Sequence, residues 1–469
     1  MVKLSGECSG SVSAESPGKS NVMHILIRNA TIVNEGSSIR GCVILKGQRI
    51  DKIFQGEKAE QDALRYCPDR DMDLDAAGKV LIPGIIDDQV HFREPGQIRK
   101  GSMTQESRAA LLGGVTSVMD MPNNTPPVTT TPALEHKYDL AAANMYVNYA
   151  FYMGSTNTNP EEVFAPKKHC CGLKIFMGSS TGNMLVDDPA VLDIFFKNYQ
   201  GIIATHCEEE SVIRKNTELA RSHYGDDIPL ILHSTIRSRE ACITSTRKAL
   251  DLALKHRARL HILHISTKEE VELIRKARRI HEGISCEASL PHIWFTRNDY
   301  VRYGTQIKCN PAVKTTEDRD AIIEAIENGD IQAIGSDHAP HTWEEKQRPY
   351  TTAPSGIPLI QHTVQMLMEC VKDDKLSLTS LVNACCHRPA SIFGIKERGF
   401  IREGFYADLV LIDPEKEHLV TKSQLEYTCR WSPMEGYRFS SSVSHVFVNG
   451  TLAAENGQIV QKPPVLPLM

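Results

Sequence analysis

Two patterns of hydrophobic and polar positions divide the chain. Near the N-terminus, the runs HILIRNATIVN (24–34) and GCVILKGQRIDKIF (41–54) place apolar residues at intervals of two, separated by Asn, Gly and Lys. This alternation predicts short β-strands joined by tight turns. Near the C-terminus, SVSHVFVNGTLAAENGQIV (442–460) repeats it and contains two Asn-Gly dipeptides, which favour hairpins. We therefore expect the two chain ends to pair in one small β-domain.

Between the two ends, strand-like apolar runs alternate with helical segments. The eight predicted strands lie within 84–92, 114–122, 145–155, 171–180, 201–210, 259–267, 283–289 and 331–341. Amphipathic patterns predict helices at 103–114, 239–257 and 268–283. Alternating strands and helices indicate a parallel sheet, and eight strands close a (β/α)8 barrel. The competing open, doubly wound sheet requires a Gly-rich phosphate turn after its first strand, which the sequence lacks.

These patterns predict an α/β protein in which a (β/α)8 TIM barrel carries a small composite β-sandwich. The expected divisions are a flexible N-terminal tail (1–22), the N-terminal half of the sandwich (23–82), the hydrolase barrel (83–395), and the C-terminal half of the sandwich with a tail (396–469). The last eight residues, KPPVLPLM, are expected to be loose.

Composition narrows the range of partners and locations. The 469 residues are 41% hydrophobic and 24% charged, with a net charge of −5, which gives no electrostatic reason to expect nucleic acid or an anionic membrane as partner. No apolar run approaches the roughly 20 residues of a membrane span, and residues 1–22 lack a signal peptide's apolar core. The 13 cysteines lack zinc-knuckle spacing, so we expect reduced thiols and a cytoplasmic protein.

Polar side chains stand where the predicted barrel strands end. In chain order these are Gln89, His91, Arg93, Lys174, His206, His264 and Asp337. The carboxyl ends of barrel strands meet at one rim, so these side chains should converge. A single histidine at a strand end would mean little, but imidazoles, a carboxylate and a lysine together form a set that suits Zn²⁺.

Lys174 needs a chemical explanation, because an ammonium group has no lone pair for a metal. It stands inside LKIFM, where a bare ammonium would be costly to bury. Carboxylation by CO₂ would convert it into a carbamate, an anion with two oxygens that can bridge two cations. We therefore hypothesise that Lys174 is carboxylated.

Six motifs together give a family resemblance. They are DDQVHFREPG (87–96), DMPNN (120–124), GLKIFMGSSTGN (172–183), THCEE (205–209), LHILHIST (260–267) and GSDHAPH (335–341). This set resembles the amidohydrolase superfamily, and within it the bacterial dihydroorotase branch, over essentially the whole chain after residue 22. The resemblance implies zinc-dependent, reversible cyclisation of N-carbamoyl-L-aspartate to dihydroorotate in pyrimidine biosynthesis, with one or two Zn²⁺ per chain and a homodimer as one expected assembly.

The resemblance also implies roles for individual residues. The metal ligands would be His91, Lys174 as the carboxylated bridge, His206, His264 and Asp337, which would also shuttle the proton. The substrate contacts would be Arg93, Asn123 and His341 at the carboxylate, Asn310 at the ring, and Ser355 with Gly356 at the ring's polar edge. The Arg93 guanidinium is a two-pronged donor that suits a carboxylate.

Gln89 departs from the family pattern, which has histidine at this position. Glutamine offers only a weak carbonyl oxygen in place of an imidazole nitrogen. We expect the metal position held by His91 and Asp337 to bind more weakly or to stay empty. The position held by His206, His264 and the modified Lys174 keeps its full set.

Two alternative functions remain. An allantoinase or hydantoinase would share the metal site, and only the carboxylate contacts separate it from a dihydroorotase. A non-catalytic homologue, retained as an assembly partner for the preceding transferase of the pathway, is suggested by the lost histidine. The other site residues are all present, which favours the enzyme.

Overall fold

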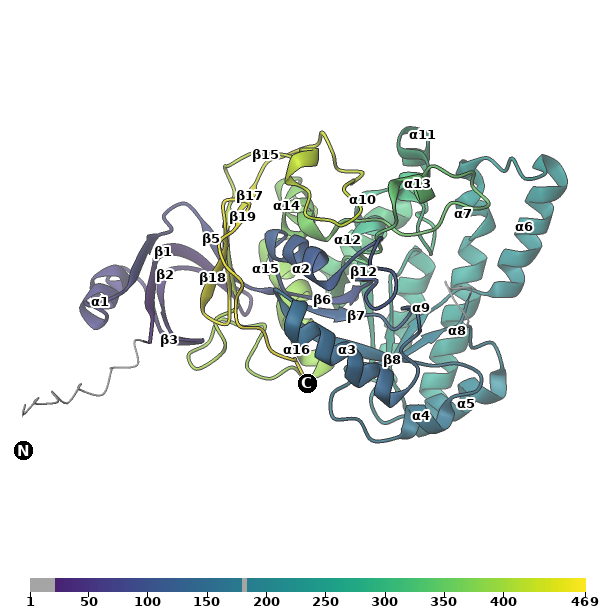
Figure 1. The fold of residues 1–469 in the computed structure, drawn as a ribbon, viewed down its shortest axis with the longest axis horizontal. Helices are drawn as coiled ribbons and strands as arrows, with labels where there is room; N and C mark the ends of the chain where they lie inside the picture. Colours follow the sequence, from purple (N-terminus) through teal and green to yellow (C-terminus); the bar gives the residue numbers. More distant parts are fainter. Residues whose placement is uncertain (1–21, 179–183) are drawn as a thin grey trace, which may run out of the picture.

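The computed structural model describes residues 22–178 and 184–469. Figure 1 shows β1, β2, β3 and α1 at one end of the molecule, the barrel at the other, and β5, β17, β18 and β19 between them. The predicted N-terminal tail up to residue 21 and the letters SSTGN (179–183) lie outside the described residues. Within the described chain, no helix is both long and apolar enough to cross a membrane.

Eight parallel strands form the barrel in chain order. They are β6 (Ile85–Val90), β7 (Val115–Asp120), β8 (Asn148–Gly154), β9 (Gly172–Phe176), β10 (Ile202–His206), β11 (Arg259–Ile262), β12 (Ile284–Ser289) and β13 (Ala333–Gly335). β13 and β6 meet where the His91 N–H donates to the His338 carbonyl at 2.8 Å. Each strand falls within a predicted range, and the predicted barrel fold is confirmed.

Helices connect and surround the strands. The longer ones are α2 (Met103–Leu112), α3 (Thr131–Asn144), α5 (Pro189–Asn198), α6 (Glu210–Tyr224), α8 (Arg239–His256), α9 (Lys268–Arg278), α12 (Thr316–Glu327) and α14 (Thr363–Lys372). Short ones are α4 (Pro160–Phe164), α7 (His233–Ile236), α10 (Leu290–Trp294), α11 (Tyr300–Tyr303), α13 (Trp343–Lys346), α15 (Leu378–Val382) and α16 (Arg388–Phe393). Side-chain caps begin the predicted helices: Ser238 accepts from the Ala241 N–H, and Thr267 from the Glu270 N–H.

The two chain ends build one nine-stranded sheet. Its strands are β1 (His24–Asn34), β2 (Ser37–Lys46), β3 (Arg49–Gln55), β4 (Met72–Asp75), β5 (Val80–Pro83), β14 (Leu409–Asp413), β17 (Ser442–Val448), β18 (Thr451–Glu455) and β19 (Gln458–Ile459). β5 and β14 join the two ends in antiparallel register, with Leu81 opposite Leu411. The sheet folds over on itself, as shown by the Ile50 N–H of β3, which donates to the Phe405 carbonyl near β14 at 2.9 Å. Its two halves share one apolar core.

Two features of this domain differ from or add to the expectation. Helix α1 (Ala59–Tyr66) packs Ala59 and Ala63 against the outer face of β1 and β2. The predicted looseness of the last eight residues is wrong: the Leu468 N–H donates to the Tyr149 carbonyl at 2.9 Å, and Leu468 is buried. The prolines keep this segment extended, so it can pair with the start of β8 while its leucines pack.

Candidate active site

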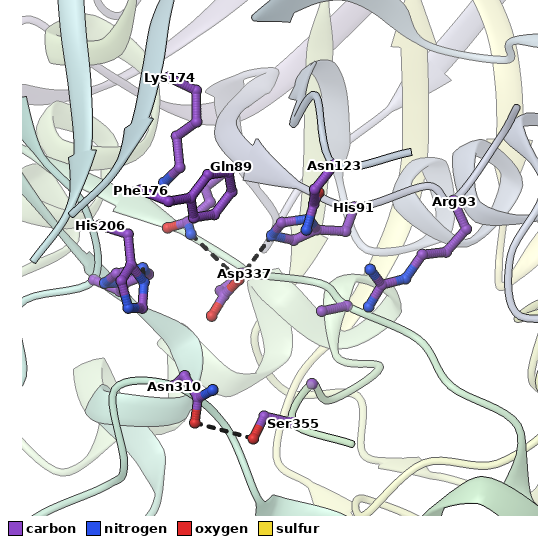
Figure 2. Close-up of a pocket in the computed structure, with 13 residues that line it drawn as sticks. Gln89, His91, Arg93, Asn123, Lys174, Phe176, His206, Asn310, Asp337 and Ser355 are labelled. Carbon is purple, nitrogen blue, oxygen red and sulfur yellow. Dashed lines mark hydrogen bonds and ion pairs between the residues drawn. The ribbon is translucent and has the colours of Figure 1, made fainter. Parts of the chain in front are cut away.

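One pocket opens at the carboxyl ends of the barrel strands. It is lined by Gln89, His91, Arg93, Asn123, Lys174, Phe176, His206, His264, Asn310, Asp337, Ala339, Ser355 and Gly356. Figure 2 shows these side chains arranged around Asp337. The structure thus brings together every site residue expected from the sequence except His341, which lies behind the pocket wall.

His206 and His264 lie side by side on one side of the pocket. His206 Nδ1 is 3.0 Å from His264 Nε2, and His206 Nε2 is 3.0 Å from Glu208 Oε2. Burial by itself raises the pKa of Glu208, but Arg237 and His206 outweigh it and hold the pKa at about 2. The resulting Glu208 carboxylate holds Nε2 of His206, so that Nδ1 is turned toward His264. Metal-ligating histidines are typically held in this way.

Lys174 lies deep in the same wall. Its side chain is almost fully buried, and its Nζ is 4.6 Å from the centroid of the Phe176 ring. Burial lowers the pKa of Lys174 to about 7, despite the opposing charges of Glu287 and Asp337. A substantial neutral fraction near pH 7 gives the amine the lone pair that reaction with CO₂ requires.

Gln89, His91 and Asp337 form the other side of the pocket. The Gln89 Nε2 group donates to Asp337 Oδ1 at 3.3 Å, and His91 Nε2 is 3.5 Å from the same oxygen. The His91 Nδ1–H donates to Asn123 Oδ1 at 2.7 Å, which leaves Nε2 with its lone pair toward Asp337. Among the described residues, the buried Gln89 Oε1 has no hydrogen-bond partner. Here the protein supplies one imidazole, one carboxylate and one amide oxygen.

Arg93 places a buried positive charge beside these groups. Its Nε donates to the Pro340 carbonyl at 3.0 Å, and its Nη2 lies 3.1 Å from His341 Nε2. Burial lowers the pKa of Arg93 to about 10, which still leaves it charged at neutral pH. His341 therefore supports Arg93 from behind. Asn123, expected at the substrate carboxylate, lines the pocket and accepts a hydrogen bond from His91 through its Oδ1.

The opposite rim is formed by the segment around Ser355. The Ser355 hydroxyl donates to Asn310 Oδ1 at 3.0 Å. Gly356 has φ +140°, and a Cβ there would lie 2.4 Å from the Ala339 carbonyl oxygen. Only glycine fits this close approach, so the backbone itself forms that part of the pocket.

Lys346 holds this rim in place, and sequence reasoning missed it. Its Nζ donates to the carbonyls of Gly356 at 2.9 Å, Pro354 at 3.0 Å and Lys308 at 3.2 Å. In the sequence, TWEEK suggests an ordinary solvated lysine on a helix. Nothing in TWEEK reveals that three carbonyl oxygens, from residue 308 and from residues 354–356, surround it.

Backbone strain is located at the pocket. Arg93, His264 and Asp337 have φ values of 68°, 39° and 46°. Non-glycine residues rarely adopt this left-handed region, and it costs on the order of 1 kcal/mol each. Three such residues lining one pocket indicate that the fold holds their side chains in imposed directions.

The donor set fits a divalent ion. His206 Nδ1 and His264 Nε2 lie 3.0 Å apart, and Glu208 holds the other nitrogen of His206, so both imidazoles can turn a lone pair to a shared point. His91 Nε2 and Asp337 Oδ1, 3.5 Å apart, offer a second pair of potential ligand atoms, one nitrogen and one oxygen. Imidazole and carboxylate groups together suit borderline divalent metals.

A second polar cluster lies inside the barrel, and it was also missed. Asp88, His261 and Glu287 are fully buried, with one potential ligand atom from each within 4.8 Å of the others. The sequence carried a signal, since Glu287 is a charged residue inside the apolar run GISCEAS and His261 stands inside the apolar run LHILHIST, three residues before His264.

Known proteins resemble the chain over most of its length. Residues 80–453 match the sequence pattern of the amidohydrolase family. A dihydroorotase from Halobacterium salinarum is 32% identical over 401 residues, covering 85% of this chain and 92% of that protein. A dihydroorotase from Pyrococcus abyssi is 32% identical over 386 residues, covering 82% and 86%.

Hydantoinases are also similar. An L-hydantoinase from Paenarthrobacter aurescens is 28% identical over 451 residues, covering 93% of this chain and 95% of that protein. The solved L-hydantoinase (dihydropyrimidinase) from Arthrobacter aurescens superposes with a TM-score of 0.86 at 26% identity, covering 93% and 97%. Barrel and β-domain are thus shared across the compared length.

Proposed function

Because the chain belongs to the amidohydrolase family, we propose that it is a metal-dependent cyclic amide hydrolase of the dihydroorotase type. The reaction is the reversible cyclisation of N-carbamoyl-L-aspartate to dihydroorotate in de novo pyrimidine biosynthesis. Dihydroorotases at 28–32% identity over most of the chain support this function. The observation that favours it most is the buried Arg93 guanidinium, which faces the same pocket as the histidines.

Zinc is the proposed metal. Members of this family generally depend on metal ions. His206, His264 and a carboxylated Lys174 would hold one Zn²⁺, and His91 with Asp337 a second, weaker one beside Gln89. A bound Zn²⁺ lowers the pKa of water and polarises the carbonyl that is attacked.

Asp337 is the proposed general base and acid. Its carboxylate lies at the centre of the pocket, held by the Gln89 amide at 3.3 Å. In hydrolysis it takes the proton of the attacking water and returns it to the departing ring nitrogen. Ring closure runs through the same groups in reverse. The imposed φ of Asp337 keeps the carboxylate directed at the reacting atoms.

Arg93 supplies specificity. Dihydroorotate carries a carboxylate that a plain hydantoin or allantoin lacks. The guanidinium is fixed by Pro340 and backed by His341, so it meets that carboxylate without reorganising. Ser355 and Asn310, bonded to each other on the opposite rim, are the proposed contacts for the polar edge of the ring.

The hydantoinase alternative rests on the L-hydantoinase likeness. Its substrates need the same metal chemistry but no partner for a carboxylate. A buried arginine with no anion to bind would be costly, which favours dihydroorotate. A non-catalytic assembly role is disfavoured by the complete set of catalytic groups other than the histidine replaced by Gln89.

One assay with two variants tests the proposal. Zinc-loaded protein is supplied with dihydroorotate, allantoin and hydantoin in parallel, and dihydroorotate should be preferred. Arg93→Met should lower kcat/KM for dihydroorotate by ~10²-fold, because a buried charge pair loses one partner at about 3 kcal/mol. The exposed Arg99→Met is the matched control and should leave kcat/KM unchanged.

Asp337→Asn separates the enzyme from the scaffold. It should abolish turnover of every substrate while the variant stays folded. Faster turnover of hydantoin or allantoin than of dihydroorotate would overturn the proposed substrate. Unchanged turnover by Asp337→Asn would overturn the catalytic role.

Location and assembly complete the proposal. The cysteines of the described chain are all free thiols, most of them buried, and this favours a reducing compartment such as the cytoplasm. We also propose a homodimer. Light scattering coupled to size-exclusion chromatography measures it directly, and a monomeric mass would contradict it.

A further inference from the structure

The interior of the barrel holds a polar cluster that the proposed reaction does not use. Asp88 comes from β6, His261 from β11 and Glu287 from β12, and all three side chains are inaccessible to solvent. We propose that these three residues bind a divalent transition-metal ion, Zn²⁺ or Mn²⁺, in a site separate from the pocket. This proposal holds whether or not the enzyme acts on dihydroorotate.

The three side chains lie close enough together to share one ligand. His261 Nε2 lies 3.0 Å from Asp88 Oδ2 and 3.8 Å from Glu287 Oε2. In the described part of the chain, both Asp88 carboxylate oxygens, His261 Nε2 and Glu287 Oε2 nevertheless lack a hydrogen-bond partner. Such buried atoms cost roughly 1–3 kcal/mol each when left without a partner. A cation between them would satisfy all three side chains.

Neighbouring groups hold His261 and Glu287 in place for this role. His261 Nδ1 lies 2.8 Å from the Ser285 Oγ, whose own hydrogen is donated to the Leu260 carbonyl. In this arrangement the neutral imidazole carries its hydrogen on Nδ1 and its lone pair on Nε2. Glu287 Oε1 accepts the His264 N–H at 3.1 Å, which turns Oε2 toward the cluster. Metal-ligating histidines and carboxylates are typically fixed in this way.

Charge supports the same conclusion. Two carboxylates lie close together in a region closed to water, where like charges repel and desolvation is costly. A divalent cation balances both charges. An imidazole nitrogen with two carboxylate oxygens suits Zn²⁺ or Mn²⁺ better than Mg²⁺ or Ca²⁺, which prefer oxygen ligands alone.

The competing explanation is a proton shared between the two carboxyl groups. This explanation predicts no metal. It also predicts that Asp88→Asn is tolerated, because an amide can donate to Glu287 as a protonated carboxyl does. The two explanations therefore differ in metal content and not only in stability.

Anomalous diffraction tests the site in the wild-type protein. Crystals grown from zinc-loaded protein should show a zinc-edge peak at about 2.0–2.2 Å from Asp88, His261 Nε2 and Glu287. A peak in the pocket with none at the cluster would overturn the proposal. This measurement does not depend on any variant folding.

Elemental analysis after dialysis gives the second measurement. Asp88→Asn should hold one ion per chain fewer than the wild type. Glu270→Gln, which changes another buried glutamate that bonds Thr246 and Thr267, is the matched control and should lose none. Equal metal content in Asp88→Asn and the wild type would overturn the proposal. Because metal content is measured independently of turnover, an inactive enzyme would not affect the result.

Discussion

At the residue scale, Gln89 is the position that sets the metal content of the pocket. Its amide bonds Asp337 at 3.3 Å beside His91, where an imidazole would add a nitrogen ligand. The Gln89→His variant should therefore bind zinc at this position at least ~10-fold more tightly than the wild type, a gain of about 1.4 kcal/mol in binding free energy. Zinc titration of metal-free protein measures the change.

The control for this prediction is Gln200→His, which adds an exposed histidine before β10, away from the carboxyl ends of the strands. It should leave zinc affinity unchanged. If Gln89→His binds no more zinc than the wild type, the idea that glutamine weakens this position is wrong.

Some residue positions could be predicted from the sequence and others could not. His206, His264 and Asp337 were found because each stands where an apolar run ends, and barrel topology then brings strand ends together. Asp88 and Lys346 were not, because their roles depend on which distant groups surround them. The carbonyls around Lys346 come from two separate segments, at residue 308 and at residues 354–356.

At the element scale, the segment of residues 350–356 depends on Lys346. Lys346→Met would leave the carbonyls of Gly356, Pro354 and Lys308 buried without their donor. The rim that carries Ser355 should then loosen, raising KM for dihydroorotate by ~10-fold with a smaller change in kcat. Steady-state kinetics measure both, with the exposed Lys372→Met as control. A fall in kcat alone would contradict this positioning role.

Asp318 fastens the N-terminal ends of three barrel helices. Its carboxylate accepts hydrogen bonds from Nη1 and Nη2 of Arg239, both at 2.7 Å. It also accepts from the Lys268 N–H at 3.1 Å and the Thr315 hydroxyl at 2.7 Å. Asp318→Asn should therefore lower the free energy of unfolding at pH 7 by about 2 kcal/mol. The exposed Asp320→Asn in the same helix should change it little.

This stabilisation should depend on pH in a definite direction. Burial alone would raise the pKa of Asp318, but Arg239, Thr315 and the Lys268 N–H outweigh it and hold the pKa below its ordinary 3.8. The unfolded chain therefore binds this proton first as the pH falls. The contribution of Asp318 to the free energy of unfolding is complete above pH 3.8, and it is lost as the pH falls through the lower pKa that Asp318 has in the folded protein. Denaturation of the wild type and of Asp318→Asn at pH 7 and at about pH 3 should show that their free energies of unfolding differ less at the lower pH.

Elements were predictable where one pattern dominates. Most residues of the barrel strands are buried, so strands such as β8, β9 and β10 appear as short, largely apolar runs. Boundaries were less certain: α9 ends at Arg278 although its polar pattern continues to residue 283. The packed C-terminal segment was missed because a proline-rich stretch makes few local bonds, and its partners, the start of β8, Asn449 and His169, come from other parts of the chain.

At the scale of the whole molecule, one buried network joins the β-domain to the barrel. Arg398 bonds Asp408 and the Asn449 Oδ1, and Asp408 also accepts the Asn449 N–H at 2.7 Å. Asn148, the first residue of β8, donates to Asp408 at 3.3 Å and accepts from Asn449 at 2.8 Å. The network thus links the residue before β14, the β17–β18 hairpin and the barrel wall at the end opposite the pocket.

Asp408→Ala tests whether this network unites the molecule. It would leave the Arg398 guanidinium, only 4% exposed, as an unpaired buried charge, at a cost of roughly 3–5 kcal/mol. The variant should unfold at a lower temperature than the wild type. Its kcat/KM at 25 °C should be unchanged, because the pocket lies at the other end of the strands. Arg398→Met combined with Asp408→Leu should recover at least half of the loss, since neither charge then remains. If the double variant is as unstable as Asp408→Ala, the loss comes from packing, and the network does not hold the two parts together through its charges.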